Sequence, residues 1–179
     1  VDRRQRQMCI RDRLVDIHDA YRPNGFSRTY PNLLTQEGIH GNEQVPNADH
    51  NTMLPFTRFT IGAGDYTPGY TRKDLQTTFA HRLALPVIYY SPAQFLFWNE
   101  KLTDEHKRPE LDFWKNIPTV WQDTKFLLGE IGEYAVVARR SGTTWYVGGI
   151  TNTNARCLQL DCSFLSSDKK YIATIYTHD

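Results

Sequence analysis

Several common signatures are missing from this chain of 179 residues. Neither a Cys-x-x-Cys pair nor a His-Glu-x-x-His motif occurs, so a zinc site has no local support. The glycines at positions 62 and 64 lack the further glycine of a dinucleotide-binding loop and the lysine of a phosphate-binding loop. No run of about 18 apolar residues occurs, so the sequence predicts no membrane insertion.

The chain also has little net charge and few cysteines. The 21 Lys and Arg residues against 20 Asp and Glu residues give a net charge of +1, which argues against a nucleic-acid partner. Of the three cysteines, Cys157 and Cys162 are five residues apart on one expected strand, over 157–164. An odd spacing places their side chains on opposite faces of that strand, so we expect free, buried thiols.

Polar loops between short apolar runs are the most informative feature that is present. The runs at 14–17 and 56–61 are expected to be strands, because Gly and Pro break the intervening segment and exclude one long helix. The polar candidates on the loops are Asp16, Asp19, Glu37, Glu43, Asp49 and Asp65, with His18, His40 and His50. Clustered carboxylates suit calcium coordination or the acid and base of glycoside hydrolysis, although such residues in loops are often only solvated or form turns.

Specific motifs lie in the same region. They are RTYPN at 28–32, the segment 37–43, LPFTR at 54–58 and DYTPG at 65–69. In these motifs, and over nearly everything from residue 14 onward, the chain closely resembles glycoside hydrolase family 97, the calcium-dependent exo-α-glucosidases and α-galactosidases. The resemblance implies oligosaccharide substrates, a calcium cofactor and, for such a family, a periplasmic or secreted location.

The resemblance also implies roles for individual residues. Glu43 falls on the general acid and Glu37 on a calcium ligand, while His18 would contact the sugar and His50 would line or support the same pocket. Asp19 falls where inverting α-glucosidases of the family carry a glutamate that is both catalytic base and calcium ligand. Retaining members lack that glutamate and use an aspartate on another strand as the nucleophile, so the resemblance leaves inversion and retention open.

The expected fold is of the α/β class followed by an all-β part. A complete eight-stranded (β/α)8 barrel, the TIM barrel, needs about 250 residues. We therefore expect residues 14–118 to be the C-terminal portion of such a barrel, and residues 119–179 to begin an antiparallel β-sandwich. The sequence would then be a C-terminal fragment of a larger enzyme. An inactive carbohydrate-binding or structural remnant is the alternative, because half of the site would be absent.

Residues 1–13 are treated separately. They fit neither the family nor a signal peptide, which needs an apolar core, and they resemble a translated sequencing adaptor. We leave them out of the reasoning about fold.

The remaining elements follow from periodicity. Apolar residues at helical spacing predict a helix over 74–85, with a cap at Asp74 and a kink at Pro86. A short helix is expected over 109–116. Alternating residues predict a hairpin with strands over 133–140 and 143–151, and further strands over 157–164 and 171–177.

Overall fold

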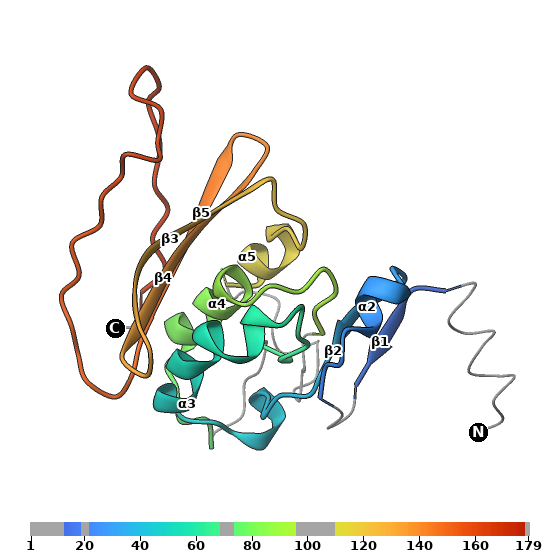
Figure 1. The fold of residues 1–179 in the computed structure, drawn as a ribbon. Coiled ribbons are helices and arrows are strands. Elements are labelled where there is room, and N and C mark those ends of the chain that lie inside the picture. Colours follow the sequence, from blue (N-terminus) through green and yellow to red (C-terminus); the bar gives the residue numbers. More distant parts are fainter. Residues whose placement is uncertain (1–12, 19–21, 69–73, 96–109, 178–179) are drawn as a thin grey trace, which may run out of the picture.

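The fold is described from a computed structural model, shown in Figure 1. The structure describes residues 13–18, 22–68, 74–95 and 110–177. Within this part of the chain, no helix combines the length and the apolar character that crossing a membrane would require.

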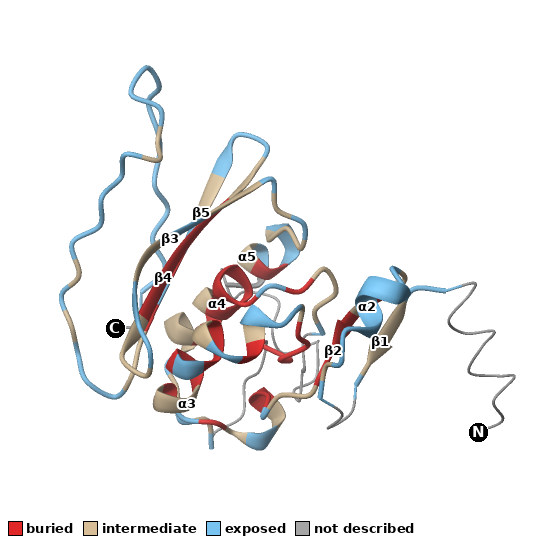
Figure 2. Cartoon of the chain, in the orientation of Figure 1, coloured by how far each residue is buried: buried red, intermediate tan, exposed pale blue. Residues whose placement is uncertain are grey.

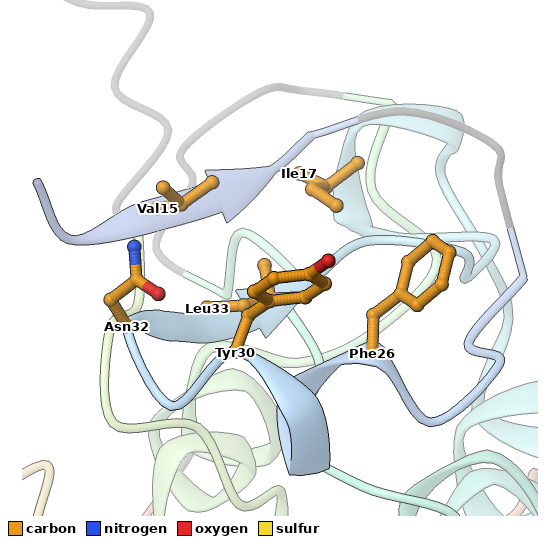
Figure 3. Close-up of a pocket in the computed structure, with 6 residues that line it drawn as sticks. All are labelled: Val15, Ile17, Phe26, Tyr30, Asn32 and Leu33. Atoms are coloured by element: carbon orange, nitrogen blue, oxygen red, sulfur yellow. The ribbon is translucent and has the colours of Figure 1, made fainter. Parts of the chain in front are cut away.

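The first described elements form one parallel β-α-β unit. Strand β1 (Val15–Ile17) pairs in parallel with β2 (Leu33–Gln36), and the short helix α2 (Phe26–Thr29) connects them. Because side chains alternate along a strand, Val15 and Ile17 face α2 while Asp16 and His18 face the other side. Figure 3 shows the apolar side, a hollow of about 210 Å³. Its lining is Val15, Ile17, Phe26, Tyr30, Asn32 and Leu33.

Short helical turns follow β2. They are the 3₁₀ turns η1 (Asn42–Gln44), η2 (Leu54–Phe56) and η3 (Arg58–Thr60), with helix α3 (Ala48–Met53) between the first and the second. The strand expected over 56–61 is therefore wrong. Pro55 lies in the first turn of η2, where its fixed φ favours helical geometry, and Phe56 and Phe59 are spaced for one helical face.

Helix α4 (Phe79–Ile88) is shifted along the chain from its expected position at 74–85. Its cap is Thr78, whose Oγ1 accepts a hydrogen bond from the backbone N–H of His81 at 3.2 Å. Pro86 lies inside the helix, and Tyr89 N–H still bonds to the carbonyl oxygen of Leu85 at 2.7 Å. The helix therefore continues past the proline to Ile88, and the expected kink stays a prediction.

A three-stranded antiparallel sheet forms the second part of the fold. Its order is β3 (Asp123–Glu130), β4 (Tyr134–Ser141) and β5 (Thr144–Thr151). The β4–β5 hairpin confirms the expected one, and Gly142 in its turn has a φ of +58°, a conformation that glycine adopts readily. Strand β3 was not predicted as a separate element. The short helix expected over 109–116 is confirmed as α5 (Glu110–Asn116).

The core lies between α4 and this sheet, where buried residues of the helix face buried residues of β4 in Figure 2. Leu85, Ile88 and Val137 are almost completely buried there. The approach is closest at Gly148 on β5, because a Cβ atom at this position would lie only 2.8 Å from the carbonyl oxygen of Ala84. Only a residue without a side chain allows the strand to pack this tightly on the helix.

After β5, the described chain runs without helix or strand to residue 177. The strands expected over 157–164 and 171–177 are therefore wrong, since alternation alone provides no partner for their backbone groups. Cys157 and Cys162 are free, as expected, but exposed rather than buried. The described residues thus form a small α/β unit followed by an antiparallel sheet. The assignment of residues 14–118 to the C-terminal portion of a barrel and of residues 119–179 to the start of a β-sandwich stays a prediction.

Candidate active site

The candidate site forms at the carboxyl ends of the two parallel strands. His18 directly follows β1 and Glu37 directly follows β2. The backbone N–H of Glu37 donates to the carbonyl oxygen of Ile17 at 2.8 Å, which continues the pairing beyond the last residue of β2. Adjacent parallel strands therefore bring these two side chains to the same edge of the sheet, the edge where α/β proteins bind ligands.

A loop between η3 and α4 brings in a further carboxylate, Asp65. Its backbone N–H donates to the carbonyl oxygen of Gln36 at 3.2 Å, so the loop lies alongside the end of β2. The next residue, Tyr66, accepts a hydrogen bond from the backbone N–H of Asn42 at 2.9 Å. Since Asn42 begins η1, this bond also holds Glu43 of that turn beside Asp65.

His18 connects two carboxylates. Its Nε2 lies 2.8 Å from Oε1 of Glu43, and its Nδ1 lies 2.9 Å from Oδ2 of Asp65. The side chains of His18 and Glu43 are 44% and 30% exposed, whereas that of Asp65 is 0% exposed. One side of this arrangement is therefore open to a ligand, and the other is closed by the protein.

Glu37 completes the cluster. One ligand atom each from His18, Glu37 and Glu43 lie within 4.8 Å of one another, and the same holds for Asp16, His18 and Asp65. Glu37 is buried. Four carboxyl groups thus surround one imidazole, which makes this end of the sheet strongly negative.

The charges change the protonation of His18. Desolvation, the largest single effect, lowers its pKa, but the hydrogen bond to Asp65 and the charges of Glu37, Asp65 and Glu43 together raise it above the ordinary value. The cluster thus favours the imidazolium form, which neutralises part of the negative charge.

Asp16 lies on the buried side of the cluster. Burial and then the neighbouring Asp65 raise the pKa of the Asp16 carboxyl to about 7. Its Oδ1 atom is buried and makes no hydrogen bond with the described residues. A carboxyl group in this state can remain protonated near neutral pH, or it can accept a cation.

Arg58 holds the end of β2 in place. Its Nη2 donates to the carbonyl oxygens of Gln36, Glu37 and Ala63 at 2.7, 3.1 and 3.1 Å, and its Nη1 donates to that of Gly62 at 3.1 Å. The guanidinium group binds these carbonyl groups because the end of a strand and the following turn leave such acceptors unpaired.

His50 contacts His40 rather than the members of the cluster. Its Nε2 donates to the carbonyl oxygen of His40 at 3.1 Å, and the two rings are 5.3 Å apart. Burial and then the neighbouring His40 lower the pKa of His50, so the ring is neutral at pH 7. Its expected place in the sugar pocket stays a prediction, and Asp19 lies outside the described residues.

Sequence reasoning gave no role to two members of the cluster. Asp16 and Asp65 were among the six acidic candidates, but nothing in the spacing set them apart. The available signal for Asp65 was its position at the start of the DYTPG motif, and for Asp16 its alternation with apolar Val15 and Ile17. A third acidic candidate, Asp49, lies elsewhere, where its Oδ1 accepts hydrogen bonds from Thr153.

The donor set fits a hard cation better than zinc. Carboxylate oxygens predominate among the candidate ligand atoms, the buried Oδ1 of Asp16 makes no hydrogen bond with the described residues, and within the cluster only His18 offers nitrogen. Calcium prefers such oxygen ligands. Paired carboxyl groups at an open edge of a sheet can also carry out acid and base chemistry.

Comparisons with known proteins find similar sequences and a similar structure. The family model "Glycosyl-hydrolase 97 C-terminal, oligomerisation" matches residues 120–179. The chain is 40% identical to a retaining alpha-galactosidase of Bacteroides thetaiotaomicron, over 97% of this chain and 29% of that protein. It is 39% identical to a probable retaining alpha-galactosidase of Streptomyces bingchenggensis, over 76% of this chain and 22% of that protein.

A solved structure is similar as well. It is a substituted Glycoside Hydrolase Family 97 enzyme from Pseudoalteromonas sp. strain K8 in complex with panose, with a TM-score of 0.74 and 31% identity. The match covers 85% of this chain and 26% of that one. The chain therefore spans less than a third of the length of the relatives that it matches.

Proposed function

Because this chain belongs to glycoside hydrolase family 97, we propose that the protein carrying it is an exo-α-glycosidase that releases terminal α-linked galactose or glucose from oligosaccharides. The observation that carries the proposal is the bridge from Glu43 through His18 to Asp65 at the carboxyl ends of two parallel strands. Carbohydrate as the substrate class is supported by the panose complex of the similar solved enzyme. A periplasmic or secreted location is part of the proposal and rests on the family resemblance alone.

Glu43 is the general acid in this proposal. It is the carboxyl group of the cluster that is both partly exposed and hydrogen-bonded to His18. A general acid must reach the glycosidic oxygen, and a carboxyl group on the exposed side of the cluster is placed to do so. His18, exposed on the same side, would bind a sugar hydroxyl.

Calcium would be held by Glu37, with Asp19 as a second carboxylate ligand. Glu37 is buried beside His18 and Glu43, and its oxygens suit a hard cation. The ion would supply positive charge that keeps partner carboxylates ionised and orients sugar hydroxyls. The residues of this chain would position the sugar, exclude water from its buried side and move the proton at Glu43.

Retention of anomeric configuration is the stereochemical outcome that we propose. Both curated relatives bear the name retaining alpha-galactosidase, and Asp19 is one methylene shorter than the glutamate that the resemblance places in inverting members. In a retaining mechanism, Asp19 would act only as a calcium ligand, and a carboxylate on another strand would be the nucleophile. Under inversion, Asp19 would be the base. Galactose is favoured for the same reason as retention.

The experiment uses the complete protein that carries this segment. Hydrolysis of matched aryl α-galactosides and α-glucosides would be measured, and proton NMR would identify the anomer released first. Release of the α-anomer of galactose supports the full proposal, whereas the β-anomer would assign inversion and restore Asp19 as the base. Absence of hydrolysis on every α-glycoside, with retained sugar binding, would instead favour the carbohydrate-binding alternative.

A further inference from the structure

Asp65 is held so that only one of its oxygens faces the site. Its Oδ1 accepts hydrogen bonds from the backbone N–H groups of Thr67 at 3.3 Å and Phe95 at 3.5 Å. Its Oδ2 lies 2.9 Å from Nδ1 of His18. The side chain is 0% exposed, so water does not compete for either oxygen. The orientation of the carboxylate is therefore fixed by the backbone of its own loop and of the segment after α4.

A carboxylate in this position determines which ring nitrogen of His18 carries a proton. An ionised carboxylate can only accept hydrogen bonds, so Nδ1 must be an N–H donor toward Asp65. This holds for the neutral imidazole and for the imidazolium alike. The ring is then turned so that Nε2 faces Glu43 at 2.8 Å.

We propose that Asp65 is a positioning residue that fixes the orientation and the Nδ1-protonated state of His18, so that Nε2 of His18 meets the carboxyl group of Glu43. Asp65 does not reach the substrate, because it is completely buried. It acts through His18 in the way that a carboxylate orients a catalytic or metal-binding imidazole. The catalytic consequence rests on the function proposed above, whereas the state of the His18 ring does not.

The informative substitution is Asp65→Asn, which changes one group without changing the size of the side chain. The N–H groups of Thr67 and Phe95 would keep the amide oxygen on their side. The amide NH₂ would then point at Nδ1 of His18 and donate to it, which forces the proton from Nδ1 to Nε2. The ring would then carry its proton on Nε2 and none on Nδ1, the reverse of the arrangement that Asp65 imposes at Nδ1.

The ring state can be read directly by ¹⁵N NMR of the complete protein labelled in histidine, with His18 assigned through His18→Gln. We expect a protonated Nδ1 in the wild type and an unprotonated Nδ1 in Asp65→Asn. The matched control is Asp49→Asn, an equivalent change at a carboxylate that bonds Thr153 and should leave His18 unaltered. A wild-type Nδ1 without a proton, or a Nδ1 still protonated in Asp65→Asn, would overturn the proposal.

A kinetic cycle gives the second readout and separates this inference from the function itself. Asp65→Asn should lower kcat by roughly 10–100-fold with little change in KM. If Asp65 acts through His18, the double variant Asp65→Asn/His18→Gln should lose no more than His18→Gln alone, whereas additive losses would contradict the proposal. If the wild type hydrolyses no α-glycoside, the proposed function fails, and the NMR experiment still decides the role of Asp65.

Discussion

Nε of Arg139 donates to the carbonyl oxygen of Val87 at 2.5 Å, which joins the middle of β4 to the last turn of α4. Nη2 of the same arginine donates to Ile88 at 3.1 Å. Carbonyl groups at the end of a helix lack partners within the helix, and the negative end of the helix dipole attracts a cation. A buried arginine thus caps α4 from the neighbouring sheet.

Replacing this arginine should loosen the contact between α4 and the sheet. Arg139→Met removes two charge-assisted hydrogen bonds and leaves buried carbonyl groups unpaired, so we expect a loss of about 2–4 kcal/mol in the free energy of unfolding. Arg140→Met is the matched control, because the neighbouring arginine bonds Gln122 and Gly142 at the surface. Urea unfolding of both variants in the complete protein provides the measurement, and equal small losses would show that Arg139 is no cap.

Removal of the proposed acid should affect substrates unequally. In Glu43→Gln of the complete protein, hydrolysis of substrates with poor leaving groups should fall by a factor on the order of 100 or more. An activated aryl glycoside needs little protonation and should suffer less. Steady-state rates on both substrates test this, and Glu130→Gln at the exposed end of β3 is the control. Equal, small losses on the two substrates would remove Glu43 from the role.

Calcium removal should abolish activity reversibly. The proposed ligands are oxygens, so chelation should inactivate the complete protein, and added calcium should restore the rate while zinc should not. Elemental analysis of the purified protein would identify the bound ion. Full activity of a protein that has been freed of metal would refute the calcium proposal.

His81 should make stability depend on pH. Burial and then Arg82 lower its folded-state pKa from 6.5 to about 4, and its Nε2 accepts a hydrogen bond from Nδ2 of Asn51 at 3.1 Å. The unfolded chain therefore binds more protons below pH 6.5, so the contribution is present above that pH and is lost as pH falls toward 4. The loss should reach about 2 kcal/mol at pH 5.

Urea unfolding at pH 7 and pH 5 tests this dependence. His81→Gln keeps an acceptor for Asn51 but cannot be protonated, so this variant should show a smaller change between the two pH values. The same pH dependence in the variant and the wild type would assign the effect to other groups.

The chain expressed without further sequence should associate or remain molten. Large apolar side chains are exposed on β3 and on the final segment, including Phe126 at 73%, Ile172 at 99% and Ile175 at 78%. Strands β3 and β5 both have an unpaired edge in the described sheet, and such edges promote aggregation. Sedimentation and thermal melting are the measurements, and a soluble monomer with a sharp melt would contradict this expectation.

The sequence predicts an element correctly where interactions between neighbouring residues alone decide its structure. The β4–β5 hairpin was predicted because its alternation ends at Gly142, a residue suited to the turn. The segment around Pro55 was misread as a strand, since Phe56 and Phe59 fit a helical turn equally well. The choice between the two depended on distant partners, which a single sequence does not contain.

The candidate site shows the same difference between features that local sequence predicts and features that depend on distant contacts. The family resemblance points to His18, Glu37 and Glu43 from the sequence, and the structure brings these three together. The role of Asp65 could not be read, because it is 47 positions from His18 and meets it only through the pairing of its loop with β2. Sequence patterns identify reactive groups more readily than the buried residues that hold them.

The close contact between Gly148 and Ala84 joins two elements that are synthesised at different times. The helix α4 leaves the ribosome before the strand that covers it, and at about 5–20 residues per second the interval is roughly 3–12 s. Until β4 and β5 have both emerged, the apolar face formed by Leu85 and Ile88 has no complete sheet against it. Slow codons between the helix and these strands would lengthen the time for which this face is exposed.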